Sequence, residues 1–216
     1  MQNAKLKKKK RVEKIISLLK REYDVRCPLH HKNPFQLAVA VTLSAQCTDK
    51  QVNKVTPMLF RKYPDAKSLA KADPCDIEKL IHSTGFYKNK TKSIQGMARE
   101  VLKTHKGKMP QTLEELTKLP GIGRKTANVV LGVAWGIPGI VVDTHVKRLT
   151  NRMGFTKQKD PTKIEFEMMK LLPKKDWNDF GLLLIYHGRA VCEARKPDCP
   201  HCLLQKICPK VGISFN

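Results

Sequence analysis

The sequence predicts an all-α protein, and three observations favour that fold class. Helix caps and proline starts recur along the chain, apolar residues repeat with a period near 3.6, and no Asn-Gly turn joins two alternating segments. The one β-like run is Ile140–Val142, and three residues do not make a sheet. With 216 residues, the chain can form one large domain or two small ones.

The helices can be placed in order from their start signals and their apolar spacing. Side chains that cap a helix, some followed by a proline at the first helical position, are Asn33-Pro34, Asp49, Asp73-Pro74 and Thr112. Thr112 and Glu115 have the spacing of a capping box, and Pro57 is expected to bend its helix. Further helices are expected over about 88–104, 124–134, 144–153, 162–172, 178–191 and 201–207.

The composition indicates the class of partner. The chain has 42 Lys and Arg against 19 Asp and Glu, a formal charge of +23 that favours a polyanionic partner. No apolar run approaches the ~18 residues of a membrane-spanning helix. The basic run Lys7–Lys10 is followed by an amphipathic segment over 12–20, not by the apolar core of a signal peptide. We therefore expect a cytoplasmic protein with no membrane partner, whose thiols stay reduced.

Four of the seven cysteines fall within a short C-terminal segment. They are spaced C-x6-C-x2-C-x5-C and comprise Cys192, Cys199, Cys202 and Cys208. Clustered thiols in a reducing compartment indicate a metal centre more often than disulfides, and this proline-rich segment has little apolar material of its own. The spacing alone leaves two metals open, a zinc ion or an iron–sulfur cube.

The segment 119–127 has a glycine turn between two predicted helices. Gly121 and Gly123 permit a tight turn with positive φ, and the absence of side chains lets backbone N–H groups at the next helix start approach a phosphate. An ordinary helix–helix turn is the alternative. However, Arg124 and Lys125 lie on the first turn of that helix, where the helix dipole disfavours positive charge. This placement favours a functional role for the two cations.

Lys125 and Asp143 are the two candidate reactive residues. A helix N-terminus, the neighbouring Arg124 and partial burial would each favour the neutral amine of Lys125, which is the nucleophilic form. A surface lysine that binds phosphate is the alternative reading. Asp143 follows Ile140–Val142 and has the position of a helix N-cap, which is its simplest role, but its carboxylate could also stabilise a developing cation.

The glycine turn, Asp143 and the cysteine spacing together resemble one family, the endonuclease III family of helix–hairpin–helix DNA glycosylases. The resemblance extends from about residue 28 to 209. The matching stretches are Leu43–Asp49, Gly85–Lys90, Leu119–Val130, Val142–His145, His187–Arg189 and the four cysteines.

This resemblance implies a two-domain fold and a cofactor. One domain is a six-helix barrel over residues 27–137, which contains the helix–hairpin–helix. The other joins residues 1–26 to 138–216 and holds a [4Fe–4S] cluster on Cys192, Cys199, Cys202 and Cys208. The resemblance also implies a monomer whose partner is double-stranded DNA with a damaged pyrimidine or an abasic site. The expected location is the nucleoid of a prokaryotic cytoplasm. The damaged nucleotide would be flipped out of the stack into a cleft between the domains.

The resemblance also implies the reaction. Lys125 would attack the sugar and expel an oxidised pyrimidine, which leaves a Schiff base, and β-elimination would then cut the strand. Asp143 would stabilise the cationic transition state and assist the proton transfers. Expected DNA contacts are the duplex-entering residues Gln46 and Phe86, the amides of Gly121 and Gly123, and the phosphate contacts Arg124, Arg195 and Lys196. Phe86 replaces a leucine of many relatives, and both side chains are apolar.

Two other functions compete with this reading. Adenine-mismatch glycosylases share the fold and the cluster, but they typically lack the lysine that this chain has as Lys125. A non-catalytic helix–hairpin–helix protein with a structural metal would bind DNA without needing Lys125 and Asp143 together. The presence of both residues therefore favours the enzyme.

Overall fold

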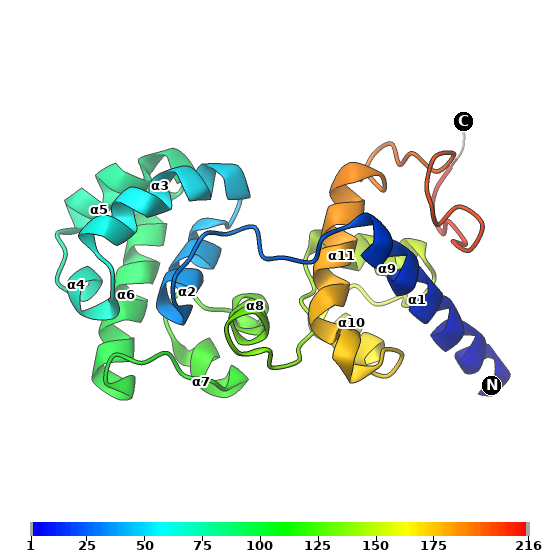
Figure 1. Cartoon of the computed structure of the whole chain (residues 1–216), viewed down its shortest axis with the longest axis horizontal. Coiled ribbons are helices and arrows are strands. Elements are labelled where there is room, and N and C mark those ends of the chain that lie inside the picture. Colours follow the sequence, from blue (N-terminus) through cyan, green and yellow to red (C-terminus); the bar gives the residue numbers. More distant parts are fainter. Residues whose placement is uncertain (1, 215–216) are drawn as a thin grey trace. The chain divides into compact units, whose positions relative to one another are not determined.

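A computed structural model describes residues 2–214, with side chains from residue 6 onward, and every regular element in that part is a helix (Figure 1). The predicted fold class is therefore confirmed. Residues 1, 215 and 216, which the sequence assigned to the second domain, lie outside the described part.

The chain divides into two compact units, each with its own apolar core. Residues 27–137 form one unit, and residues 1–26 together with 138–216 form the other. Each unit buries a separate set of aliphatic side chains, so each has the hydrophobic core that a domain needs. The six-helix barrel remains a prediction.

The unit of residues 27–137 is arranged around one nearly fully buried helix. Its helices are α2 (Pro34–Leu43), α3 (Asp49–Lys62), α4 (Ala66–Ala70), α5 (Pro74–Ile81), the 3₁₀ turn η1 (His82–Thr84), α6 (Tyr87–His105), α7 (Leu113–Lys118) and α8 (Arg124–Trp135). Residues 35–43 of α2 are all buried. Because α2 is apolar on every face, neighbouring helices must cover it, and α3, α6 and α8 do so.

The helix starts largely follow the predicted caps. The Asn33 side chain accepts a hydrogen bond from Gln36 N at 2.9 Å before α2, and Asp73 caps α5 in the same way. Thr48 caps α3, so the assignment of this role to Asp49 is wrong by one residue. Thr48 has the extended backbone of an N-cap, whereas Asp49 is already helical and its charge favours the first turn.

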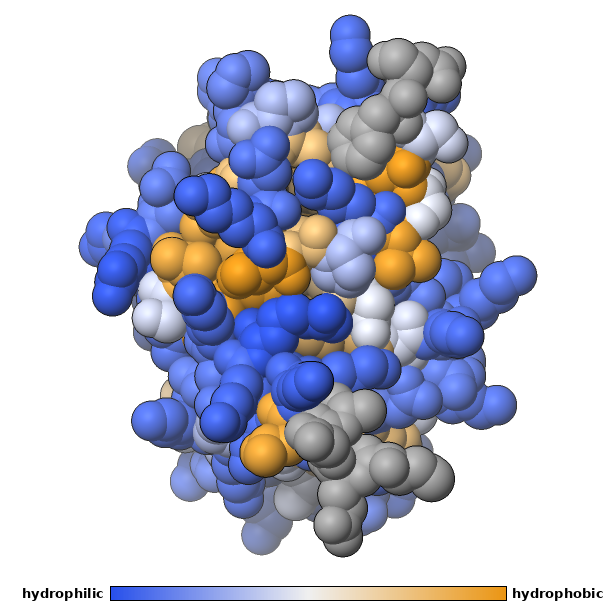
Figure 2. Space-filling model, turned by 90° about the vertical axis from the view of Figure 1, so that its right-hand side faces the viewer, coloured by the Kyte–Doolittle hydropathy of each residue, from blue (hydrophilic) through white to orange (hydrophobic). Residues whose placement is uncertain are grey.

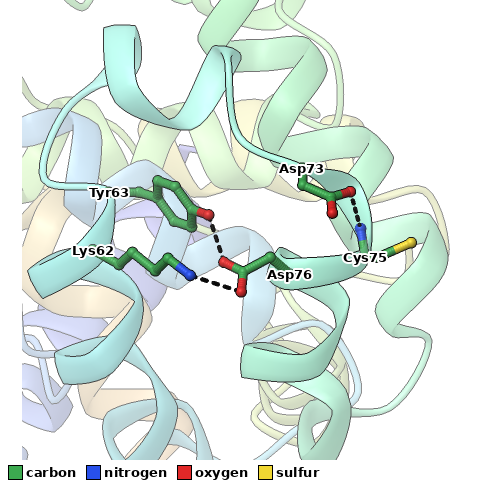
Figure 3. A network of polar contacts seen from close by, with 5 residues as sticks. All are labelled: Lys62, Tyr63, Asp73, Cys75 and Asp76. Atoms are coloured by element: carbon green, nitrogen blue, oxygen red, sulfur yellow. Dashed lines mark hydrogen bonds and ion pairs between the residues drawn. The ribbon is translucent and has the colours of Figure 1, made fainter.

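A polar network ties α3 to α5 (Figure 3). Asp76 on α5 accepts a hydrogen bond from Tyr63 Oη at 2.5 Å and contacts Lys62 Nζ at 2.7 Å. Both partners lie at the C-terminal end of α3, where a basic residue also complements the helix dipole. These contacts hold the pKa of Asp76 below its ordinary value, first through the hydrogen bond from Lys62 and then through that from Tyr63.

The other unit consists of α1 (Gln2–Glu22), α9 (Thr144–Arg152), α10 (Pro161–Met169), η2 (Lys174–Asp176) and α11 (Trp177–Ala190). The helix α1 extends to both sides of the amphipathic segment predicted over 12–20. Its buried stripe is Val12, Ile15, Ile16 and Leu19, and α1 packs against α11. Lys7–Lys10 are exposed on the same helix, and Lys20 contacts Asp176 and Asp179.

The helix predicted over residues 201–207 does not form. This segment is a series of turns, with Cys202 N donating to Cys199 O and Cys208 N donating to Leu204 O. Pro200 and Pro209 bound the segment, and its buried side chain is Leu204. The local apolar spacing was therefore misleading, because a series of turn hydrogen bonds takes the place of a helix here.

The surface agrees with the composition. Hydrophilic residues cover most of the face that Figure 2 shows, with apolar residues gathered between them. In the described part of the chain, no helix is both long enough and apolar enough to cross a membrane.

Candidate functional site

The glycine turn joins α7 to α8 and packs against α6. Leu119 and Ile122 are buried beneath the turn, whereas Gly121 and Gly123 are exposed. Gly121 has φ +77°, and a Cβ atom there would lie 2.6 Å from the Cβ of Ser93 on α6. Both its backbone conformation and its close approach to α6 therefore require glycine at this position.

Gly123 has a different role from the one expected. Its φ is −86°, so the prediction of a positive φ is wrong for this residue. Gly123 is the N-cap of α8 and offers no side chain to the N–H groups of the first turn. An added Cβ at this position would meet no atom within 4 Å, so the backbone here is open to an approaching anion.

Lys125 is the second residue of α8, after Arg124, and its side chain is exposed. The first turn of α8 contains no acidic residue, so the dipole and both cations favour an anion there. The partial burial expected for Lys125 is not seen in the protein alone. Desolvation of its amine would therefore have to come from a bound ligand.

Asp143 is the N-cap of α9, as its position in the sequence predicted. Its Oδ1 accepts a hydrogen bond from Val146 N at 2.9 Å, and the residue is half-buried beyond the buried run Ile140–Val142. The cap fixes the carboxylate and needs only one of its two oxygens. On the following turn, His145 Nδ1 lies 3.2 Å from Arg148, and burial is the main cause that lowers the pKa of His145.

The four C-terminal cysteines line one cavity. Its walls include His187, Arg152 and Leu204 as well as Cys192, Cys199, Cys202 and Cys208. Within the described residues, no three His, Cys, Asp or Glu side chains could hold a single metal ion. Burial raises the pKa of the Cys202 and Cys208 thiols, and the other cysteines of the group raise both further.

N–H groups point at two of these sulfur atoms. Arg152 donates to Cys192 Sγ at 3.4 Å, and Leu204 N donates to Cys202 Sγ at 3.4 Å. His187 Nε2 lies 3.5 Å from Cys202 Sγ, while burial lowers the pKa of His187 to about 4. Groups of this kind stabilise metal-bound thiolates.

Two arginines of α9 organise the loop that follows Cys192. Arg152 donates to Glu193 O at 2.6 Å and to Ala194 O at 2.7 Å, and Arg148 donates to Cys192 O at 2.9 Å. Neither arginine was predicted from the sequence, although their four-residue spacing places them on one helix face. Further along the loop, Arg195 and Lys196 are exposed, as phosphate contacts need to be.

Gln46 and Phe86 share a rare backbone conformation. Both are exposed residues with positive φ, +52° and +48° respectively, and 63% of Phe86 is accessible to solvent. Gln46 follows α2 and Phe86 is the N-cap of α6, so both lie in the unit of residues 27–137. Lys125 belongs to the same unit, whereas Asp143 and the four cysteines belong to the other.

A family model and the sequences of known proteins point to the same family. Residues 39–174 match the HhH-GPD superfamily of base excision DNA repair proteins. Endonuclease III of Synechocystis sp. is 54% identical over 96% of this chain and 95% of its own. Endonuclease III of Escherichia coli K12 is 37% identical over 94% and 96%, respectively.

Solved structures agree with the sequence comparison. A non-covalent endonuclease III–DNA complex matches with a TM-score of 0.88 and 41% identity, over 94% of this chain and 95% of that chain. A trapped covalent intermediate of endonuclease III with DNA has the same TM-score and identity, over 94% and 96%.

Proposed function

Because the chain belongs to the HhH-GPD superfamily of base excision DNA repair proteins, and within it to the endonuclease III family, we propose that Lys125 and Asp143 carry out its reaction. The protein is a DNA glycosylase that also cleaves the strand as an abasic-site lyase. The observation that carries the assignment of Lys125 is its exposed position on the first turn of α8, next to the open backbone of Gly123.

The reaction starts with the amine of Lys125. In its neutral form, the amine attacks the anomeric carbon of the sugar, while the bond to the base breaks and the base leaves with the electron pair and gains a proton. Loss of the amine protons and opening of the sugar ring give a Schiff base. A proton then leaves the neighbouring carbon, and the 3′ phosphate departs by β-elimination.

Asp143 supplies negative charge as the sugar becomes cationic. Its carboxylate is fixed by the α9 cap, so it needs little reorganisation to stabilise that charge. It also accepts and returns protons during ring opening and elimination. The substrate class is oxidised pyrimidines in duplex DNA, and the enzyme acts as a monomer.

The remaining residues hold the DNA. Gln46 and Phe86 enter the duplex and occupy the space that the flipped nucleotide leaves, for which the exposed Phe86 ring is suited. The backbone amides near Gly121 and Gly123 bind a phosphate. Arg124, Arg195 and Lys196 contact the DNA backbone and set the position of the enzyme on the duplex.

The four cysteines bind a [4Fe–4S] cluster. The donor set supports this group, because four thiols line one pocket and N–H groups point at two of the sulfurs, those of Cys192 and Cys202. When bound, the cluster supplies covalent cross-links between turns that have little apolar packing. It thereby fixes the loop that presents Arg195 and Lys196.

Borohydride trapping tests the reaction, because it reduces the Schiff base to a stable amine. Wild-type protein should become covalently attached to DNA that contains thymine glycol or an abasic site. The Lys125→Gln variant should give no adduct, whereas Arg124→Gln, the matched change at the preceding residue, should bind DNA less tightly but still be trapped. Trapping of Lys125→Gln at the wild-type rate would refute the assignment.

Iron analysis with a visible absorption spectrum tests the cofactor. Four iron atoms per chain and a brown protein are expected. A colourless protein with one zinc atom per chain would refute the cluster and assign the four cysteines to zinc, the other metal that their spacing allows.

A further inference from the structure

A buried lysine, Lys90, lies beneath the two segments that carry Gln46 and Phe86. It is the fourth residue of α6, and only 5% of it is accessible to solvent. A lysine is seldom buried to this extent unless its charge is paired or hydrogen-bonded. Burial lowers the pKa of Lys90, while the neighbouring Cys47 opposes this shift.

The ammonium group of Lys90 is held by backbone carbonyls. Its Nζ donates to Leu43 O at 2.8 Å and to Thr84 O at 2.8 Å. Leu43 is the last residue of α2, and Thr84 is the last residue of η1. The carbonyls at helix ends lack partners within the helix and carry partial negative charge, so a cation is well placed between them.

These two carbonyls precede the two strained residues. Gln46 follows Leu43 by three positions, and Phe86 follows Thr84 by two. Both residues have the left-handed backbone that side chains other than glycine rarely adopt. Such a conformation persists only where the surrounding structure enforces it. Lys90 also fixes the far side of Phe86, because its backbone N–H donates to Phe86 O at 3.0 Å.

We propose that Lys90 is a positioning residue that sets the distance between the Gln46 and Phe86 segments, and thereby the two side chains that enter the duplex. One ammonium group joins both segments. The Gln46 segment follows α2 and the Phe86 segment leads into α6, and these two helices pack together in one unit (Figure 1). This inference rests on the proposed function, since it assumes that Gln46 and Phe86 enter DNA. Lys90 itself does not touch the substrate.

The proposal predicts a specific loss when the ammonium is removed. Lys90→Met keeps the apolar stem and removes the charge and the donors. The measured quantity is the preference for an abasic duplex, that is, the affinity for a duplex with a tetrahydrofuran abasic analogue divided by the affinity for an intact duplex. We expect this preference to fall about tenfold or more in the variant, because small misplacements of positioning groups have large effects. Trapping on a single-stranded abasic oligonucleotide should stay within about twofold of wild type, since no base stack has to be filled.

Gln95→Met is the matched control. Gln95 lies on the same helix, is 5% accessible, and donates from Nε2 to a distant carbonyl, Ala72 O, at 2.7 Å. This variant also loses a partly buried hydrogen bond, but not one that holds the duplex-entering segments. Its preference for the abasic duplex should remain within about twofold of wild type.

Two further measurements keep the proposal testable if Lys90→Met does not fold. Lys90→Arg retains the charge, but its planar group cannot place donors in the same position, so it should fold and lose part of the preference. Phe86→Ala should lower the preference by a smaller factor in the Lys90→Arg background than in the wild-type background, because both changes act on one function. Fully additive effects would contradict the proposal.

The outcomes distinguish failure of the proposed function from failure of the role of Lys90. If the wild type neither prefers the abasic duplex nor forms the borohydride adduct, the proposed function fails, and the role of Lys90 fails with it. If the wild type does both and the Lys90 variants keep its preference, only the role of Lys90 is refuted. Equal losses on duplex and single-stranded DNA would also refute it, because they would indicate general destabilisation.

Discussion

Asp143 combines a structural task and a chemical one in a single carboxylate. One oxygen caps α9 through Val146 N, and the proposed reaction uses the charge of the group. Two substitutions separate these tasks because asparagine is as good an N-cap as aspartate, whereas alanine is not. The comparison distinguishes loss of catalysis from loss of the fold.

Asp143→Asn should leave thermal stability close to that of wild type and slow base release by about 100-fold or more, since general acid–base and charge stabilisation are lost. Asp143→Ala should lose the same activity and also about 1 kcal/mol of unfolding free energy. Single-turnover base release and urea unfolding measure the two effects. An Asp143→Asn variant with wild-type turnover would assign the residue to capping alone.

At the residue scale, the sequence predicted the side-chain roles that depend on residues nearby in the sequence. The cap at Asp143 and the grouping of the four cysteines at one pocket follow from spacing along the chain. Lys90 could not be recognised among 42 basic residues, because its burial depends on packing between α2 and α6. The expected burial of Lys125 failed for the same reason.

At the scale of elements, the two glycines of the turn between α7 and α8 differ in how well they tolerate a side chain. Gly121→Ala should cost about 1–2 kcal/mol of unfolding free energy, because its φ is positive and its Cβ would clash with Ser93. Gly123→Ala should cost only about 0.5 kcal/mol, because its φ is negative and the space is open, so the variant loses only the better N-capping of glycine. Urea unfolding measures both variants.

Gly123→Ala also tests the proposed phosphate site. An added methyl group at Gly123 would lie where a phosphate approaches the α8 N-terminus, so DNA affinity should fall although stability changes little. Unchanged affinity of Gly123→Ala for duplex DNA would show that the phosphate binds elsewhere.

The network between α3 and α5 gives a pH-dependent prediction (Figure 3). Lys62 and Tyr63 hold the pKa of Asp76 below its ordinary value, so the stabilisation is present above that ordinary value and is lost as the pH falls through the lowered one. Asp76→Asn should therefore melt below wild type at neutral pH, and the two should converge under acidic conditions. An equal gap in melting temperature at every pH would contradict this contribution.

Element starts were more predictable than turns. The caps at Asn33 and Asp73 act within a few residues, so the local sequence determines them. The segment 201–207 has apolar residues at helical spacing, yet it forms turns around the cysteine-lined cavity. One of its thiols, that of Cys202, lies 3.5 Å from His187 Nε2 on α11, a contact between elements that the local sequence does not determine.

At the scale of the whole molecule, the charge of +23 comes from basic residues that have different roles. It implied a polyanion, and the family then identified DNA as the partner of this enzyme class. Composition could not assign tasks to individual lysines, because Lys90 is internal while Lys7–Lys10 are exposed on α1.

Replacement of Lys7–Lys10 by glutamine keeps helix propensity and removes four charges. The salt dependence of duplex binding should become flatter, with the log–log slope reduced by about 0.9 for each lysine that neutralises a phosphate. Strand cleavage at saturating enzyme should be unchanged. An unaltered slope would remove this run from the DNA-binding surface.

The central claim is that Lys125 forms the covalent bond with the sugar. Peptide mapping of the borohydride-reduced adduct by mass spectrometry tests it directly, because it identifies the modified residue rather than the effect of a substitution. We predict that the mass of the reduced sugar fragment lies on Lys125. An adduct on any other amine, or no adduct on DNA that the protein binds and cleaves, would contradict the mechanism.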